Sequence, residues 1–381
     1  MIKRSPVRVA ATSGQLPSAS DRAPARYVFV LERTLGHVSH AKNLERSLAQ
    51  RSDIDATIVN VAPTTSWTPD LPLLGSWSLR ASLSARSQVR NVVGGADALF
   101  IHTQVAAHLL VATMRHVPTV ISLDATPINF DSVGEPYGHR RQGDAFEWAK
   151  LQLHARVFRA ARALVSFSHW AAESLVDDYG VQADKVSVIP QGVDLSLFRP
   201  PERRRPAEKA RILFVGGDFA RKGGTDLLEA VRGMGDRVEL DIVTSAEVSA
   251  APPNIRCRVH RDISPQSPQL IELFQRADLF TLPTRADCSP NVVAEALGAG
   301  LPIIATRIGG IPELVHEGVN GHLVSAHSPR ELTQAIENLV DQPHLRMAMG
   351  AESRRLAERE HDAVRNCQAL LTLMAGISEP Q

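Results

Sequence analysis

Short apolar runs alternate with segments of helical periodicity along most of the chain, and this alternation limits the fold more than any other feature. Such runs, bounded by turn residues, are typical of strands buried on both faces, and strands separated by helices assemble into parallel sheets. The same alternation begins again at Arg211. We therefore predict an α/β protein of two doubly wound, Rossmann-like domains that face each other across a cleft. In the first half, strands are expected at residues 27–31, 56–61, 98–102, 119–123, 163–167 and 186–189.

The domain borders follow from the length and the local composition. A chain of 381 residues is too long for one ordinary core and suits two domains of roughly 150 to 200 residues each. Residues 198–207 combine proline with charged side chains and offer little to a core, as expected of a linker. The sequence predicts a flexible tail at 1–24, an N-terminal domain at 25–198, a linker at 199–210 and a second domain at 211–354.

Charge and cysteine content exclude several classes of function. The 42 basic and 41 acidic side chains nearly balance, so the chain has no general attraction for nucleic acid. The three cysteines form no Cys-x-x-Cys pair, which favours a reducing compartment and argues against a zinc site, and no metal is expected. No apolar run is long enough to span a membrane, so we expect a cytoplasmic protein. Residues 71–93 mix leucines and Trp77 with arginines, which fits either contact with the inner face of a membrane or an ordinary helix with a solvated basic face.

The stretch after the apolar run 277–283 predicts an anion site at the start of a helix. Ser289 and Pro290 supply an N-cap and a first-turn residue, and Gly298 and Gly300 end the helix. The first backbone N–H groups of a helix have no helical partner and can bind an anion at the carboxyl end of the preceding strand. In this helix those N–H groups belong to Asn291, Val292 and Val293.

Two carboxylates lie around this expected anion site. Asp287 precedes the helix, and Glu295 falls on its second turn. A carboxylate there can accept hydrogen bonds from two vicinal hydroxyls, such as those of a ribose. The alternative is that Asp287 favours the helix dipole and that Glu295 is solvated.

A second strand, glycine turn and helix lie about sixty residues upstream. The apolar run 212–215 is followed by Gly216 and Gly217, and then by Arg221 and Lys222 ahead of another glycine pair. Glycines allow a ligand to approach the backbone closely, and the two cations could neutralise a diphosphate leaving group. Adjacent cations in a turn are otherwise commonly solvated.

Together these motifs resemble those of the family 4 glycosyltransferases, in which two acids eight residues apart precede a small-residue turn, an apolar strand and a glycine-rich loop ending in Pro-Glu. The resemblance implies that Glu295 binds the ribose of a nucleotide-diphosphate-sugar donor and that Lys222 neutralises its diphosphate. The first acid is Asp287 instead of Glu, one methylene shorter. The usual family arginine position is Gly217 here, and Arg221 is the predicted substitute.

The same resemblance implies the GT-B architecture, retention at the anomeric carbon and a last helix, within 355–381, that crosses back to the N-terminal domain. It also places acceptor recognition in the N-terminal half. Gly36 matches a family loop near the donor phosphates, and His37 is predicted on the acceptor side. Many members have a His-Asp pair after the strand 119–123, whereas this chain has Leu123 and Asp124. Asp124 either holds an acceptor hydroxyl or bonds the backbone of its own turn.

We therefore predict a retaining glycosyltransferase that moves a hexose-type sugar from a nucleotide-diphosphate sugar to a hydroxyl of a sugar, lipid-linked or small-molecule acceptor, with no cofactor and no metal. The predicted catalytic residues are Lys222, Arg221, Asp287 and Glu295. The predicted donor-binding residues are Gly36, Gly216, Gly217, Ser289, Pro290, Asn291, Val292 and Val293, with His37 and Asp124 on the acceptor side. Two alternatives stay open: an epimerase or phosphorylase on the same fold, and a noncatalytic protein that binds sugar nucleotides.

Overall fold

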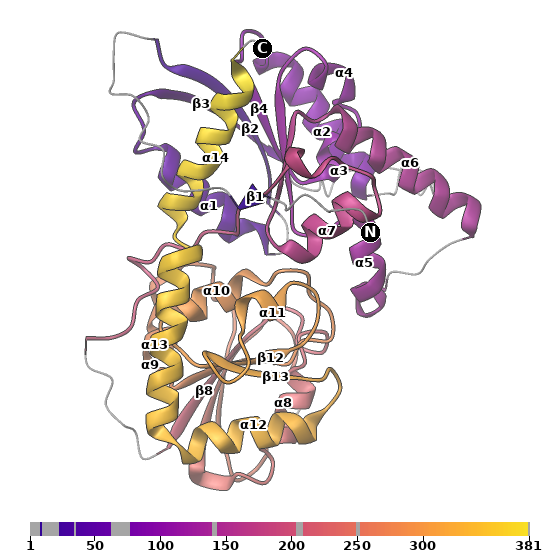
Figure 1. Cartoon of the computed structure of the whole chain (residues 1–381). Helices are drawn as coiled ribbons and strands as arrows, with labels where there is room; N and C mark the ends of the chain where they lie inside the picture. The colour runs from indigo at the N-terminus through magenta and orange to yellow at the C-terminus, as the bar shows by residue number, and fades with distance from the viewer. Residues whose placement is uncertain are drawn as a thin grey trace, which may run out of the picture. The chain divides into compact units, whose positions relative to one another are not determined.

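The computed structural model describes residues 8–9, 23–33, 36–61, 77–138, 143–202, 209–248 and 252–379. The chain divides into two compact units, each built on one parallel sheet (Figure 1). One unit comprises residues 1–129, 141–190 and 364–381, and the other comprises 130–140 and 191–363. The fold class predicted from the sequence, two doubly wound α/β units of GT-B type, is confirmed.

The first unit has a seven-stranded sheet of order β1-β7-β6-β5-β4-β2-β3, in which every pairing is parallel. Its strands are β1 (Arg8–Val9), β2 (Ala25–Glu32), β3 (Ile54–Val61), β4 (Ala98–His102), β5 (Thr119–Leu123), β6 (Ala163–Ser166) and β7 (Val186–Val188). Its helices are α1 (His37–Leu48), α2 (Trp77–Val92), α3 (Gln104–Ala107), α4 (Val111–Met114), α6 (Asp144–Ala160) and α7 (His169–Asp177), and α14 (Ala363–Ser378) lies almost wholly within this unit. The six expected strands are all present, and two residues of the expected tail form β1.

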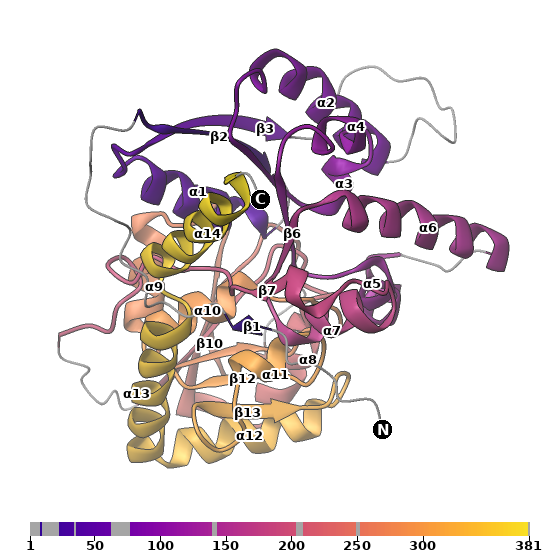
Figure 2. The ribbon, with the colours of Figure 1, turned by 45° about the horizontal axis from the view of Figure 1, so that its top comes forward.

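Helices cover both faces of this sheet, and the side chains of β2 show why its apolar run is continuous. Val28 and Val30 point into one core, with α2, α3, α6 and α7, whereas Phe29 points into the other, with α1 and α14. Successive strand residues face opposite sides, so a strand covered on both faces needs apolar residues at every position. Figures 1 and 2 show α14 beside α1, and its Met374 belongs to that second core.

The second unit has a six-stranded parallel sheet of order β10-β9-β8-β11-β12-β13. Its strands are β8 (Ala210–Val215), β9 (Val238–Val243), β10 (Arg256–His260), β11 (Leu279–Leu282), β12 (Ile303–Thr306) and β13 (Gly321–Val324). Its helices are α8 (Gly224–Val231), α9 (Pro268–Arg276), α10 (Asn291–Gly298), α11 (Ile311–Leu314), α12 (Pro329–Asp341) and α13 (Pro343–Glu360). The helix α5 (Pro127–Val133) lies where the chain passes from the first unit to the segment 130–140.

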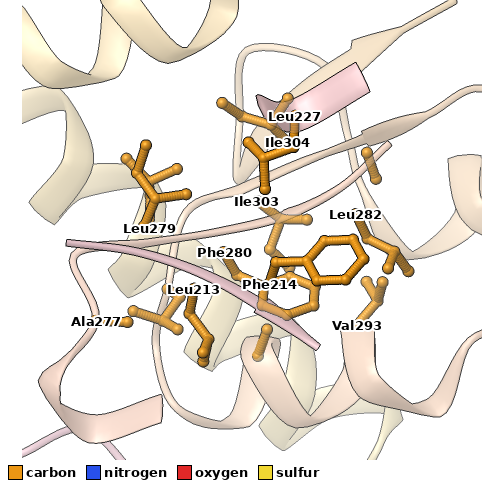
Figure 3. Close-up of a cluster of buried hydrophobic side chains, with 14 of the residues drawn as sticks. Leu213, Phe214, Leu227, Ala277, Leu279, Phe280, Leu282, Val293, Ile303 and Ile304 are labelled. Atoms are coloured by element: carbon orange, nitrogen blue, oxygen red, sulfur yellow. The ribbon is translucent and has the colours of Figure 1, made fainter. Parts of the chain in front are cut away.

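A single apolar core fixes the two predicted motifs of this unit relative to each other. Phe214 from β8, Leu282 from β11 and Val293 from α10 are fully buried members of one cluster (Figure 3). Because β8 and β11 are adjacent parallel strands, the loops at their carboxyl ends emerge at the same edge of the sheet. The expected linker continues into β8 at Ala210, and its residues 203–208 lie outside the described residues.

A half-buried and a buried histidine in the first unit predict a loss of stability in acid. The rings of His108 and His154 lie 4.5 Å apart where α3 meets α6, and burial lowers their pKa values to about 4 and about 3. These pKa values lie below that of an unfolded histidine, so the unfolded chain takes up more protons as the pH falls through about 6.5. We expect the free energy of unfolding to fall by up to about 2 kcal/mol for each histidine between pH 7 and pH 5.

Urea titrations of the wild type and of the double variant His108→Gln/His154→Gln at both pH values test this expectation. The variant should lose less stability on acidification than the wild type does. An equal loss in the two proteins would assign the acid sensitivity to other groups.

Candidate functional site

The glycine turn between β8 and α8 packs directly against the end of β11. Gly223 has a φ of 81°, and a Cβ there would lie 1.9 Å from the carbonyl oxygen of Pro283. Gly217 differs, because among the described residues a Cβ there would approach only the Ser245 hydroxyl, at 3.8 Å. The protein's own packing therefore requires glycine at 223 but leaves open space at Gly217, as expected where a ligand approaches the backbone.

This contrast predicts different effects for two alanine substitutions. Gly223→Ala combines a left-handed backbone with a clash, so we expect a loss of at least about 2 kcal/mol in the free energy of unfolding. Gly217→Ala should leave stability unchanged and weaken the binding of a phosphate-containing ligand. Urea denaturation and calorimetric titration of both variants would measure this, and equal destabilisation of the two would contradict the role assigned to the turn.

Lys222 and Asp287, which are 65 residues apart in sequence, form an ion pair at this edge of the sheet. The ammonium group of Lys222 donates a hydrogen bond to Oδ2 of Asp287, and the two side chains are only 16% and 10% exposed. The short carboxylate of Asp287 thus reaches the cation of the glycine turn. A charge-assisted hydrogen bond of this kind is about twice as strong as one between neutral groups.

Arg221, the neighbouring predicted cation, is held by protein groups. Its Nη1 donates to the carbonyl of Ala286 at 2.9 Å, and its Nε donates to Asp218 at 3.2 Å. The guanidinium lies 4.1 Å from the ring centroid of Tyr137, a cation–π distance, and the side chain is 9% exposed. These contacts favour a role in fastening the glycine turn to the segment before α10.

The helix α10 begins one residue later than the sequence predicted. Pro290 is its N-cap, Asn291 is its first residue, and Ser289 provides no side-chain cap. The N–H of Val293 donates to the carbonyl of Pro290 at 3.0 Å, so the prediction that this N–H is unpaired is wrong. Within the described residues, the N–H groups of Asn291 and Val292 have no backbone partner, because they open the helix.

The side chain of Asn291 is a feature that the sequence interpretation missed. The residue is 8% exposed, and neither its Oδ1 nor its Nδ2 has a hydrogen-bond partner in the described parts of the chain. Leaving a buried polar group unpaired costs about 1 to 3 kcal/mol, so this amide is suited to a polar ligand. Glu295, also buried, follows four residues later and therefore lies on the same face of α10.

Two further contacts hold the segment between β11 and α10 in place. Arg285 makes a bidentate ion pair with the buried carboxylate of Asp226: its Nη2 donates to Oδ1 at 2.6 Å and its Nε donates to Oδ2 at 3.2 Å. Gly309 has a φ of 53°, and a Cβ there would lie 2.4 Å from the carbonyl oxygen of Asp287. The predicted glycine-rich loop after β12 thus packs against the backbone of Asp287. Neither support could be located from sequence spacing alone.

In the first unit, Gly36 and His37 open α1 at the carboxyl end of β2. Gly36 has a φ of −70°, and no atom of the described residues lies within 4 Å of a Cβ built on it, so their packing does not require glycine there. Asp124 follows β5 and is half-buried, whereas Leu123 before it is fully buried in the apolar core.

Across the described ranges, no group of three or more His, Cys, Asp or Glu side chains is arranged to hold a metal ion. None of the helices described there combines the length and apolar character needed to cross a bilayer. Of the stretch 71–93, residues 71–76 lie outside the described residues, and the rest forms α2, on which Leu83, Arg86 and Arg90 are exposed.

Two models of glycosyltransferase sequence families match the two halves of the chain. A model of glycosyl transferases group 1 matches residues 209–342, and a model of Glycosyltransferase Family 4 matches residues 32–197. A D-inositol 3-phosphate glycosyltransferase of Acidothermus cellulolyticus is 32% identical over 232 residues, 54% of this chain and 51% of that protein. An MMP alpha-(1->4)-mannosyltransferase of Mycolicibacterium hassiacum is 29% identical over 323 residues, 80% of this chain and 76% of that protein. The chain thus spans about half the length of the first of these relatives.

Solved structures share the fold at low identity. A sucrose-phosphate synthase from Thermosynechococcus elongatus superposes with a TM-score of 0.72 and 15% identity, over 93% of this chain and 99% of that one. Anabaena HepE in complex with UDP-glucose gives a TM-score of 0.64 and 17% identity, over 92% and 99%. At such identities the likeness concerns the fold.

Proposed function

Because the chain belongs to the family 4 glycosyltransferases, we propose that it moves a hexose-type sugar from a nucleotide-diphosphate sugar to an acceptor hydroxyl, with retention at the anomeric carbon. The observation that supports this most is the Lys222–Asp287 pair at the carboxyl edge of the second sheet, in the loops that flank α8 and α10. A cation and helix N–H groups at one sheet edge suit a diphosphate. Retention rests on the family resemblance.

In the proposed reaction, the bond between the anomeric carbon and the diphosphate oxygen breaks and negative charge grows on the diphosphate. Lys222 exchanges Asp287 for a phosphate oxygen, and the N–H groups of Asn291 and Val292 donate to the same anion. Stabilising charge that develops in the transition state is commonly the largest catalytic contribution. Glu295 accepts hydrogen bonds from the ribose hydroxyls. The acceptor oxygen forms the new bond to the anomeric carbon on the face that the diphosphate leaves, the acceptor's proton passes to the leaving phosphate, and no metal or cofactor takes part.

Relatives suggest the classes of donor and acceptor to examine first. One structural neighbour was crystallised with UDP-glucose, and two sequence relatives are named for transfer to D-inositol 3-phosphate and for α-(1→4)-mannosyl transfer. We propose a nucleoside-diphosphate hexose as donor and a hydroxyl-rich sugar, lipid-linked or small-molecule acceptor. Cytoplasmic location and contact of α2 with an anionic membrane stay predictions.

The test uses donors labelled with ¹³C at the anomeric carbon, a panel of polyol, sugar and lipid-linked acceptors, and NMR of the products. We expect a new glycoside with the donor's anomeric configuration. A product of inverted configuration would contradict retention. Conversion of the sugar without acceptor would indicate an epimerase, and dependence on inorganic phosphate would indicate a phosphorylase.

One observation favours the noncatalytic alternative enough to include it in the test. Leu123 is fully buried in the core at the position where many family members have a histidine near the reacting sugar. Donor binding measured by calorimetry, together with no turnover on the whole acceptor panel, would support a sugar-nucleotide-binding protein instead of a transferase.

A further inference from the structure

Three histidines gather in the first unit, at the edge where the parallel strands end. His37 is the first residue of α1, His40 lies one turn later, and His102 is the last residue of β4. The ring of His102 has its centroid 4.6 Å from that of His37 and 4.9 Å from that of His40. Ligands of doubly wound sheets bind at this edge, so the arrangement of the three rings bears on function.

A chain of hydrogen bonds runs from the core to His37. Nδ1 of His102 lies 2.8 Å from Oγ of Ser122, and Nε2 of His102 lies 2.9 Å from Nδ1 of His37. The register of β4 and β5 places His102 directly beside Ser122. His102 and Ser122 are both 0% exposed, whereas the side chain of His37 is 15% exposed. The chain therefore links a fully buried hydroxyl to a partly exposed imidazole.

The charge state of the two inner histidines limits where protons can lie. Burial, and then the charge of His37, lower the pKa of His102 well below its ordinary value and that of His40 to about 3. His102 is therefore neutral near pH 7 and has one ring proton. Nε2 of His40 is buried without a hydrogen-bond partner among the described residues. The ring of His40 packs against the rings of His102 and Phe167.

Two proton arrangements remain for a neutral His37. In the first, the Ser122 hydroxyl donates to Nδ1 of His102, the Nε2–H of His102 donates to Nδ1 of His37, and His37 has its proton on Nε2. In the second, both ring protons lie on Nδ1, and Nε2 of His37 presents a lone pair.

The carboxylate of Glu32 decides between these arrangements. Its Oε1 lies 3.8 Å from Nε2 of His37, and its Oε2 accepts a hydrogen bond from the Thr103 hydroxyl at 2.8 Å. A ring N–H directed toward a carboxylate is attracted to it, whereas a lone pair directed toward it is repelled. The first arrangement is therefore the stable one.

We propose that Glu32 and the Ser122–His102 pair position His37 as an Nε2–H hydrogen-bond donor, with Glu32 setting the tautomer and His102 holding the ring. His37 then donates to an oxygen of the bound substrate, either a phosphate oxygen or a sugar hydroxyl, and does not act as a base. This role rests on the proposed function, in which the acceptor's proton goes to the leaving phosphate and no side-chain base is needed. The tautomer itself does not depend on that function.

The test is ¹⁵N-histidine NMR of the full chain, which distinguishes the two tautomers of each ring, with His37→Gln used for assignment. The wild type should show His37 protonated on Nε2. His102→Gln retains an N–H near the position of ring Nε2 and should preserve this tautomer. His102→Met has a similar length but no donor. Glu32 should still favour the Nε2–H of His37, but the ring loses the hydrogen bond that holds it, and kcat should fall by about 3- to 10-fold, the value of one hydrogen bond.

Glu32→Gln is a second variant, in case His102→Met does not fold. It removes the charge that favours the Nε2–H, so it should increase the Nδ1–H population of His37. The proposal is overturned if wild-type His37 is protonated on Nδ1, if Glu32→Gln leaves the tautomer populations unchanged, or if His102→Gln and His102→Met have the same kcat. If the protein has the expected tautomer but transfers no sugar, the proposed function is refuted, whereas the hydrogen-bond chain and the tautomer of His37 are supported.

The affinity for nucleoside diphosphate and the KM for the acceptor show which of the two substrate oxygens His37 contacts. If His37 donates to a donor phosphate, His37→Met, which has no donor, should weaken nucleoside diphosphate binding in the absence of acceptor. If it donates to a hydroxyl of the acceptor, that affinity should stay unchanged while the KM for the acceptor rises. An unchanged value of both constants and of kcat would show that His37 contacts no substrate oxygen.

Discussion

Replacing Lys222 with methionine should lower kcat by on the order of 10² to 10³, because it removes one preorganised charge from the developing diphosphate. Methionine retains most of the apolar stem that packs under Gly216, where a Cβ would lie 2.9 Å from the Lys222 side chain. The variant also leaves Asp287 buried without its cation, which should lower stability as well. Steady-state kinetics and urea denaturation would measure the two effects.

A double variant separates these effects. Lys222→Met/Asp287→Asn removes the orphaned charge, so it should regain much of the lost stability and none of the lost turnover. Recovery of turnover in the double variant would show that the pair has a structural role, and that the diphosphate finds its positive charge elsewhere.

Glu295→Gln should weaken nucleoside diphosphate binding by about 10- to 150-fold, because each charge-assisted hydrogen bond contributes roughly 1.5 to 3 kcal/mol. Glutamine has the same shape and fits the buried position on α10, but it lacks the carboxylate charge. Glu229→Gln, an exposed acid on α8, is the matched control and should bind as the wild type does. Isothermal titration calorimetry would give the dissociation constants.

A deoxynucleotide shows whether the ribose is the partner of Glu295. The wild type should bind a 2′,3′-dideoxynucleoside diphosphate much more weakly than the ribonucleotide, whereas Glu295→Gln should distinguish little between them. An equal preference in both proteins would place the ribose away from Glu295.

The sequence predicted the strands well because their apolar runs are continuous, which follows from burial on both faces of each sheet. It also singled out Lys222 and Asp287, since each lies in the turn between an apolar strand and a helix, and adjacency of β8 and β11 then brings the two residues together. The family models and the shared fold agree with the predicted family and fold class.

Details that depend on contacts between distant segments could not be predicted. Arg221 stacks on Tyr137, which is far away in the sequence, and no local sequence pattern predicts this contact. The N–H of Val293 donates to the carbonyl of Pro290 because the first turn of α10 is tight. Predicted helix ends are commonly wrong by one residue, as here. The Ser122–His102–His37 chain depends on strand register, which a single sequence does not specify.

The most direct test of the central claim is a crystal structure of the chain with a bound nucleoside diphosphate. The account predicts phosphate oxygens within hydrogen-bond distance of the Lys222 ammonium and of the N–H groups of Asn291 and Val292, with the Lys222–Asp287 pair opened. A nucleotide bound elsewhere while that pair stays closed would contradict it.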